Sequence, residues 1–172
     1  DKTGEILRFD DAGRLVLIEE ANNNFVCISY NEKDGKIKSV STDKGQKAVF
    51  SYNEEGLVSK ISVEDNAYGY SYTYEDSHLV KATYQGTNGK KIEYKYSYKN
   101  GLLSDIVDAN GNSYLLEYNA NGTIGKYVKP NGEHTKYSYG YSEGEKLSKA
   151  VVSSYNGSGE DKKLSSETYS FA

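Results

Sequence analysis

A glycine that follows an aromatic segment recurs along this chain every 21 to 23 residues. The recurring position is occupied by Gly13, Gly35, Gly56, His78, Gly101, Gly122 and Gly144. So regular a spacing leaves no room inside the period for helices or for loops of variable length, so the chain must repeat one small structural unit. The sequence therefore predicts about seven copies of this unit in 172 residues.

Each unit begins with a segment in which aromatic and polar residues alternate. In residues 92–103, IEYKYSYKNGLL, the rings of Tyr94, Tyr96 and Tyr98 are separated by single polar residues. Because successive side chains of a strand point to opposite faces, these three rings must share one face of a sheet. The Asn-Gly pair that follows tolerates the positive φ of a tight reversal. This segment therefore predicts the first half of a β-hairpin.

The second half of each unit has a different apolar spacing. Apolar residues lie two and five positions beyond the glycine, as Leu15 and Ile18 do after Gly13. In a regular strand this interval of three puts the two side chains on opposite faces, so either both faces are partly covered or a β-bulge realigns them. Because the interval recurs in five units, the sequence favours a bulge, which would also increase the twist and curvature of the sheet.

Turn signals also separate one unit from the next. They are Asp43-Lys44-Gly45, Asp65-Asn66, Asn88-Gly89, Asn110-Gly111, Asn131-Gly132 and Asn156-Gly157. Each unit is therefore predicted to run strand, turn, strand, turn, which gives roughly 14 antiparallel strands in a meander. Residues 153–163, SSYNGSGEDKK, are predicted to form an extended surface loop.

The predicted fold class is all-β, an antiparallel meander of about seven β-hairpin repeats in a single array over residues 1–172. One face of such a sheet is apolar and has to be covered, and its two edge strands invite self-association. We therefore expect the meander to curl into an open barrel, a half-barrel or a hairpin-spiral shell. The sequence has no Met and ends within a strand pattern, so we expect it to be a fragment or a processed part of a longer chain.

The composition excludes several classes of partner. The net charge is −4 and the only arginines are Arg8 and Arg14, so there is no basic patch for nucleic acid. No apolar run approaches the roughly 20 residues of a membrane-spanning helix. Cys27, the single cysteine, cannot form an internal disulfide.

No group of residues predicts an enzyme, a cofactor site or a metal site. Cys27 lies in an alternating strand pattern, where a packed or half-exposed side chain is expected rather than a nucleophile. Asp108, Asn110 and Asn112 resemble the opening of a calcium loop, but Gly and Glu are missing at its sixth and twelfth positions, so an ordinary hairpin turn is expected. His78 and His134 are expected to be solvated histidines in separate turns.

The rows of tyrosines are the candidate binding face. Exposed aromatic rows can stack on sugar rings, whereas buried rings would form a core with their hydroxyl groups at its rim. The periodicity favours the core interpretation, and the exposure of the rings distinguishes the two. The candidate residues are Tyr70, Tyr72, Tyr94, Tyr96, Tyr137 and Tyr139.

The repeated unit resembles that of the RHS or YD-repeat family, which carries the signature Y-D-x-x-G-R-L and a following Y-x-Y strand. FDDAGRL at residues 9–15 is similar to this signature, and YNEEGLV, YNEKDGKI and YNANGTI are variants of it. In bacterial toxins, wall-associated proteins and teneurins, such repeats form a β-hairpin strip that spirals into a hollow shell, often around a toxic cargo domain. The units also look like those of small secreted bacterial proteins whose hairpins form a porin-like open barrel.

This resemblance implies a non-catalytic scaffold or shell wall of a secreted or cell-surface bacterial protein. The implied partners are neighbouring domains of the parent chain or a protein cargo. The alternative is a surface module that binds a glycan or a protein through the tyrosine face or the loops.

Overall fold

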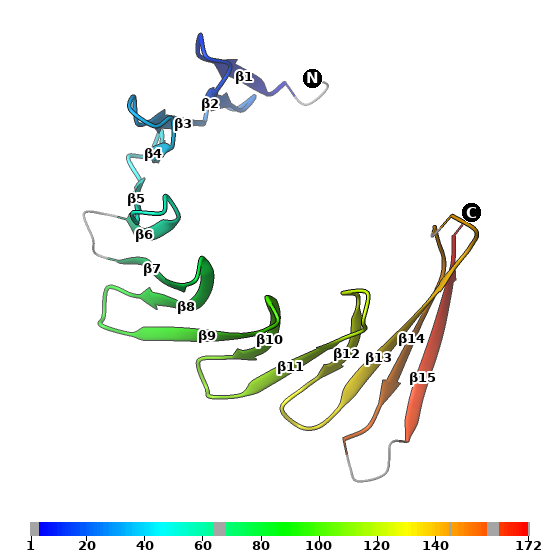
Figure 1. Ribbon diagram of the computed structural model, residues 1–172. Helices are drawn as coiled ribbons and strands as arrows, with labels where there is room; N and C mark the ends of the chain where they lie inside the picture. Colours follow the sequence, from blue (N-terminus) through cyan, green and yellow to red (C-terminus); the bar gives the residue numbers. More distant parts are fainter. Residues whose placement is uncertain (1–3, 64–67, 145, 158–161, 172) are drawn as a thin grey trace. The chain divides into compact units, whose positions relative to one another are not determined.

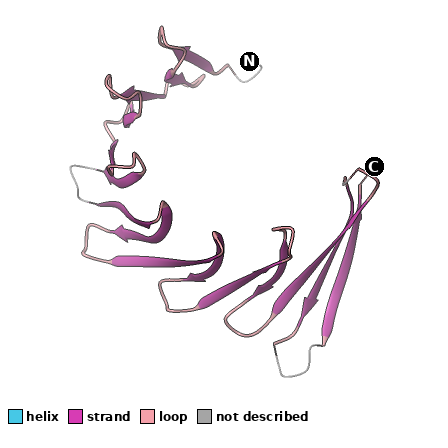
Figure 2. Cartoon of the chain, in the orientation of Figure 1, coloured by secondary structure: helices cyan, strands magenta, loops and turns pink. Residues whose placement is uncertain are grey.

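The computed structural model describes residues 4–63, 68–144, 146–157 and 162–171, which form strands and loops (Figure 2). Two compact units make up the chain, residues 1–93 and residues 94–172. Figure 1 labels the strands in chain order. The first unit contains β1 (Ile6–Phe9), β2 (Leu15–Glu19), β3 (Phe25–Tyr30), β4 (Ile37–Thr42), β5 (Lys47–Tyr52), β6 (Val58–Val63), β7 (Tyr68–Glu75) and β8 (His78–Gln85). The second contains most of β9 (Lys91–Lys99), then β10 (Leu102–Val107), β11 (Ser113–Tyr118), β12 (Ile124–Val128), β13 (His134–Tyr141), β14 (Leu147–Tyr155) and β15 (Lys163–Ser170).

The predicted antiparallel meander is confirmed. The order of strands in the sheet is the order in the sequence, from β1 to β15 (Figure 1). The described residues form 15 strands, whereas seven two-stranded units predicted roughly 14. The additional strand is β15, which follows the last hairpin. β1 and β15 are the end strands of this order.

Two hairpins reverse through only two residues. Lys99 and Leu102 are register partners, so Asn100 and Gly101 alone form the turn, with φ of 53° and 75°. The same geometry joins β7 to β8, where Asp76 and Ser77 have φ of 47° and 60°. His78 was predicted at this turn, but it is the first residue of β8, because a non-glycine pair takes the left-handed conformation before it.

The other hairpins use a longer turn, which in the β1–β2 hairpin is held together by the side chain of its first residue. The Asp10 carboxylate accepts hydrogen bonds from the backbone N–H groups of Ala12 (3.0 Å) and Arg14 (2.9 Å). Gly13 N–H donates to the Asp10 carbonyl, and its φ of 77° is open to glycine at little cost. These bonds explain why Asp and Gly are three positions apart in the repeat.

The predicted β-bulge is present in every hairpin. Arg8 is opposite Leu17 and Phe9 is opposite Leu15, so Val16 is the extra residue of the second strand. As a result Leu15 and Ile18 lie on one face although three positions separate them. The extra residues of the seven hairpins are Val16, Lys38, Ser59, Val80, Ser104, Gly125 and Ser148.

Two predicted turns differ from the structure or lie outside it. The loop expected over residues 153–163 is shorter, because β14 continues to Tyr155 and β15 begins at Lys163. The predicted Asp65-Asn66 turn lies outside the described residues. Between β2 and β3, where no turn signal was identified, Asn23 adopts a φ of 65° and takes the role that glycine has elsewhere.

Tyrosine hydroxyl groups connect successive hairpins in the first unit. The last tyrosine of each first strand donates a hydrogen bond to a backbone carbonyl at the start of the second strand of the preceding hairpin. The bonds are Tyr30 to Leu15 (2.8 Å), Tyr52 to Ile37 (2.7 Å) and Tyr74 to Val58 (2.8 Å). We call these contacts the tyrosine ties.

Cationic side chains reinforce two of the tyrosine ties. The Arg14 guanidinium lies 4.7 Å from the centre of the Tyr30 ring and donates to the Asp10 carboxylate from Nε at 2.8 Å. Lys36 Nζ lies in the same way 5.1 Å from the Tyr52 ring. Such cation–π contacts contribute about 0.5–1 kcal/mol at exposed sites. The Arg of the G-R-L signature therefore joins its own turn to the next hairpin.

Removing the hydroxyl group of one tyrosine tie should destabilise the protein measurably. In Tyr52→Phe the ring remains under Lys36, but the Ile37 carbonyl loses its donor, so we expect the free energy of unfolding to fall by about 1 kcal/mol. Urea denaturation followed by circular dichroism measures this change.

Tyr70→Phe is the matched control. Within the described part of the chain the Tyr70 hydroxyl makes no recorded hydrogen bond, and 44% of the residue is exposed, so the change should stay within about 0.5 kcal/mol. Equal effects of the two substitutions would contradict the tie.

Candidate functional site

In the first unit the predicted tyrosines lie on one face of the sheet. Tyr70 of β7 is directly opposite Ile61 of β6 and Tyr84 of β8, and Tyr72 is opposite Ala82. We call the face that bears these side chains the aromatic face. The other face is mainly polar, and Cys27 lies on it between Leu17 and Ser41.

The second unit continues the same alternation from β9 onward. Tyr96 is opposite Ile106, which in turn is opposite Tyr114 of β11. Tyr137 is opposite Val152 and Tyr139 is opposite Ala150 in the β13–β14 pair. Since three strands separate β9 from β13, the predicted tyrosines of this unit form two separate rows and not one cluster.

The prediction that these rings form a core is wrong for this chain. Among the described residues no apolar side chain is buried. Tyr70 is 44% exposed and Tyr94 41%, whereas Tyr72, Tyr96, Tyr137 and Tyr139 are half-buried. The physical reason is that strands in one sheet shelter their neighbours only from the side. The aromatic face is therefore an accessible surface with an apolar character.

Burial and neighbouring tyrosines raise the pKa of two ring hydroxyl groups on this face. Burial raises the pKa of Tyr96, and the neighbouring Tyr94 and Tyr98 raise it further. The pKa of Tyr139 is raised in the same way, first by burial and then by Tyr137 and Tyr141. These hydroxyl groups are therefore neutral hydrogen-bonding groups at physiological pH.

Ring pairs on the aromatic face involve residues that were not predicted. Tyr84 lies with its ring centre 5.1 Å from that of Tyr70, at an interplanar angle of 45°. Tyr114 and Tyr127 are stacked, with centres 6.3 Å apart and an angle of 11°. Tyr84 could have been found from the position of the Asp76-Ser77 turn, which sets the register of β8 against β7.

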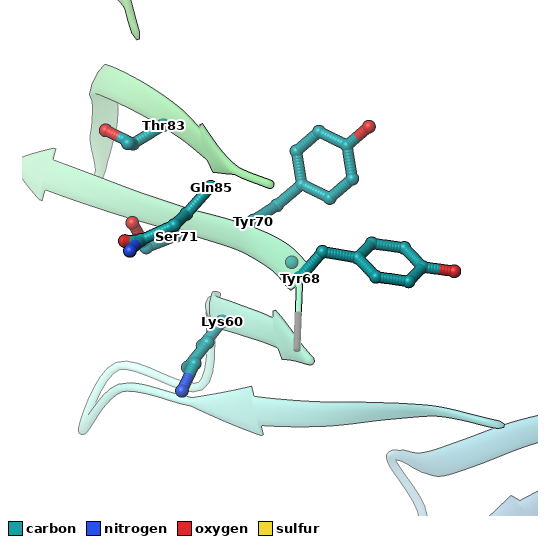
Figure 3. A pocket seen from close by; sticks show the side chains of 7 residues that line it. Lys60, Tyr68, Tyr70, Ser71, Thr83 and Gln85 are labelled. Atoms are coloured by element: carbon teal, nitrogen blue, oxygen red, sulfur yellow. The ribbon is translucent and has the colours of Figure 1, made fainter. Parts of the chain in front are cut away.

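A small notch opens on the polar face where Gly69 interrupts β7. Its volume is about 200 Å³, and Lys60, Ser71, Thr83 and Gln85 contribute polar side chains to its lining. Figure 3 shows Tyr68 and Tyr70 projecting away from Lys60 and Ser71. Gly69 is required here because a methyl group at this position would lie 2.3 Å from the Ile61 carbonyl oxygen.

A wider groove of about 610 Å³ lies between two hairpin tips of the second unit. Its apolar lining includes Leu102, Leu116, Tyr118 and Ala120. Leu102 follows the turn glycine, as Arg14 and Lys36 do in the first unit, but it has no charge to place over the next tyrosine. The polar lining comes from Lys99, Asn100, Ser104, Glu117 and Asn119.

His134 also differs from what the sequence predicted. It was expected to be a solvated turn residue, but it is the first residue of β13 and only 6% exposed. Its ring stacks on the ring of Tyr155, with centres 4.9 Å apart. Lys136 Nζ lies 4.7 Å from the centre of the same Tyr155 ring. The strand register brings these side chains together, which a turn assignment does not reveal.

The sequence that resembled a calcium loop is a hairpin turn, as predicted. The Asp108 carboxylate accepts hydrogen bonds from the backbone N–H groups of Asn110 and Asn112, both at 2.9 Å. The bonds from Asn112 are the main reason that the pKa of Asp108 lies below its usual value. No group of three or more His, Cys, Asp or Glu suited to a metal ion occurs among the described residues.

Cys27 is a half-buried residue of β3, as its strand pattern predicted. The part of the chain that the structure covers contains no helix long and apolar enough to cross a membrane.

The chain belongs to the Teneurin YD-shell family, whose sequence profile matches residues 1–168. This confirms the resemblance to YD repeats. No curated protein matches the chain.

Among solved structures, a porin-like protein from Bacteroides uniformis ATCC 8492 is similar, with a TM-score of 0.52 and 14% identity over 95% of this chain and 88% of that one. This likeness shows the fold alone.

Toxin complexes are also similar. A TcdB2-TccC3-Cdc42 structure has a TM-score of 0.47 and 15% identity over 86% of this chain and 11% of that one. The Tc holotoxin pore of Photorhabdus luminescens has a TM-score of 0.46 and 15% identity, over 87% and 12% of the two chains. This chain thus spans only about a tenth of the toxin chains that it matches.

Adding a methyl group at the notch should strain the sheet. In Gly69→Ala the new Cβ would meet the Ile61 carbonyl, and backbone cannot move aside as a side chain can. We expect the free energy of unfolding to fall by about 1–3 kcal/mol, as for other overpacked positions. Urea denaturation measures it.

Gly140→Ala, at another strand glycine, is the control. Its Cβ would lie 3.3 Å from the Cβ of Lys149, a contact that a shift of a few tenths of an ångström relieves. Alanine is also preferred to glycine in a strand by roughly 0.5–1 kcal/mol, so stability should be unchanged or higher. A loss in this variant as large as in Gly69→Ala would show that backbone crowding is not the cause.

Proposed function

We propose that this chain is a non-catalytic wall segment of a secreted or surface-exposed bacterial protein, in which the repeated hairpins help to enclose a protein cargo or neighbouring parts of the parent chain. Membership of the Teneurin YD-shell family supports a structural role. The mechanism is geometric, since a strip of similar hairpins can be extended by adding units, each of which contacts only its neighbours.

The observation that carries this proposal is the uncovered aromatic face. Fully burying a large apolar side chain contributes about 1.5–3 kcal/mol, and no apolar side chain of the described residues is buried within the chain. Rows of tyrosine, leucine and valine on one face are therefore expected to gain most of their stabilisation from a surface outside these 172 residues. A wall segment meets such a surface in the interior that it encloses.

The tyrosine ties support the same role. A wall must hold its curvature and resist sliding of one hairpin past the next. Tyr30, Tyr52 and Tyr74 each fix the end of one hairpin to the backbone of the hairpin before it. Because the contact uses a backbone carbonyl, it can recur whatever side chain lies at the receiving position.

A surface module for a glycan or a protein is the second candidate function. The exposure of Tyr70 and Tyr94 and the groove beside Tyr118 favour it. A sugar ring could stack on the half-buried Tyr118 ring while its hydroxyl groups bond to the amides and carboxylate of the groove rim. In that case the aromatic face would remain open to solvent in the whole protein.

Thiol labelling of the whole parent protein distinguishes the two candidates. In a parent protein whose thiols, Cys27 included, have been replaced by serine, Ala82→Cys places a thiol on the aromatic face and Ser41→Cys places one on the polar face. Both positions are half-buried in the chain itself. If the aromatic face is covered in the parent protein, its thiol should react with a maleimide at least about tenfold more slowly than the control.

After denaturation the two thiols should react with the maleimide at equal rates, which would show that the protection comes from folded structure. Equal rates in the native parent protein would contradict the wall proposal and support an open binding face.

A further inference from the structure

Tyr70 and Tyr84 are a pair of phenols in direct cross-strand contact. They are register partners in β7 and β8, and their ring centres are 5.1 Å apart at an angle of 45°. Rings whose centres are this close are in direct contact, so rotation of the two side chains can bring together the carbons beside their hydroxyl groups.

Both members of this pair are open to reaction. Tyr70 is 44% exposed and Tyr84 is half-buried. In the described part of the chain neither hydroxyl has a recorded hydrogen bond, in contrast to Tyr30, Tyr52 and Tyr74, whose hydroxyl groups donate to backbone carbonyls. A phenol that is not held in this way can transfer its proton to water when it is oxidised.

The composition directs an oxidant to tyrosine. The chain has 18 Tyr but no Trp and no Met, the residues that would otherwise compete for a one-electron oxidant. Cys27 is the only thiol, and it lies in β3 on the polar face. A single cysteine also means that an internal disulfide is not available as a covalent link between strands.

We propose that Tyr70 and Tyr84 form an oxidative cross-linking site, at which a peroxidase with hydrogen peroxide couples the two rings to dityrosine. Each phenol loses one electron and its hydroxyl proton to give a phenoxyl radical. The two radicals join through a carbon–carbon bond between the positions beside the oxygens, and each displaced ring hydrogen moves to oxygen. Hydrogen peroxide accepts the two electrons and two protons and becomes two molecules of water.

The link would join β7 to β8 and close the hairpin covalently. It would hold the register partners together under conditions that separate the strands, as a disulfide does in many secreted proteins. This inference does not depend on the proposed wall function, because the coupling requires only the pair itself and an oxidant.

Tyr114 and Tyr127 provide an internal comparison. These rings are 6.3 Å apart and nearly parallel, at 11°. They are diagonal neighbours and not register partners, since Tyr127 is opposite Leu116. Coupling between them requires a larger rearrangement, so proximity should favour the Tyr70–Tyr84 link.

The test is to treat the dilute protein with horseradish peroxidase and hydrogen peroxide, isolate the monomer and map its cross-linked peptides by mass spectrometry. We expect dityrosine between Tyr70 and Tyr84, two hydrogens lighter than the separate peptides and at least about fivefold more abundant than a Tyr114–Tyr127 link. Tyr84→Phe should abolish the Tyr70–Tyr84 link, because phenylalanine forms no phenoxyl radical, whereas Tyr127→Phe should leave it unchanged.

Circular dichroism of each variant confirms that it is folded, and Tyr70→Phe serves as a second way of removing the pair. A higher urea midpoint of the cross-linked monomer would support the role as a covalent link. The proposal is overturned if the monomer contains no Tyr70–Tyr84 link, if the Tyr114–Tyr127 link is equally abundant, or if cross-linking does not raise the midpoint.

Discussion

Each hairpin of this sheet has one more residue on its second strand than on its first, and this difference decides which way the apolar side chains point. Without the bulge at Val16, the three-residue interval between Leu15 and Ile18 would place one of them among polar side chains. With the bulge, both join Phe9 and Leu7 on a single face. Because the same extra residue recurs in the second strand of all seven hairpins, the face remains apolar along each unit. The uncovered face, and the need for a surface to cover it, both follow from this register.

The contacts between hairpins build on that register. The carbonyl that accepts each tyrosine tie belongs to the residue directly before the bulged one, as Leu15 precedes Val16. The cation after the turn glycine then lies over the same ring, as Arg14 does over Tyr30. Where Leu102 replaces this cation, a groove is present beside Tyr118. The repeat signature is therefore a set of residues that serve the junction between hairpins as well as the turn within one.

The strands, their order and the bulges could be predicted from the sequence, because alternation and turn chemistry are local. The Asn100-Gly101 turn needs only two residues that tolerate positive φ. The position of His78 could not be predicted in this way, since Asp76 and Ser77 form a left-handed turn without glycine. The exposure of the tyrosines was also missed, because alternation shows that rings share a face but not whether anything covers it. His134 and Tyr155 come together through a register that spans 21 residues, which no local pattern contains.

Backbone NOEs across β5 and β6 test the register most directly. The account predicts that Ser51 is opposite Lys60 and Tyr52 opposite Val58, with Ser59 skipped, so NOEs should connect these two pairs in solution. A regular ladder, in which Ser51 is opposite Ser59 and Tyr52 opposite Val58, would contradict it. In that case Ile61 would no longer share a face with Val58, and the continuous aromatic face would not exist.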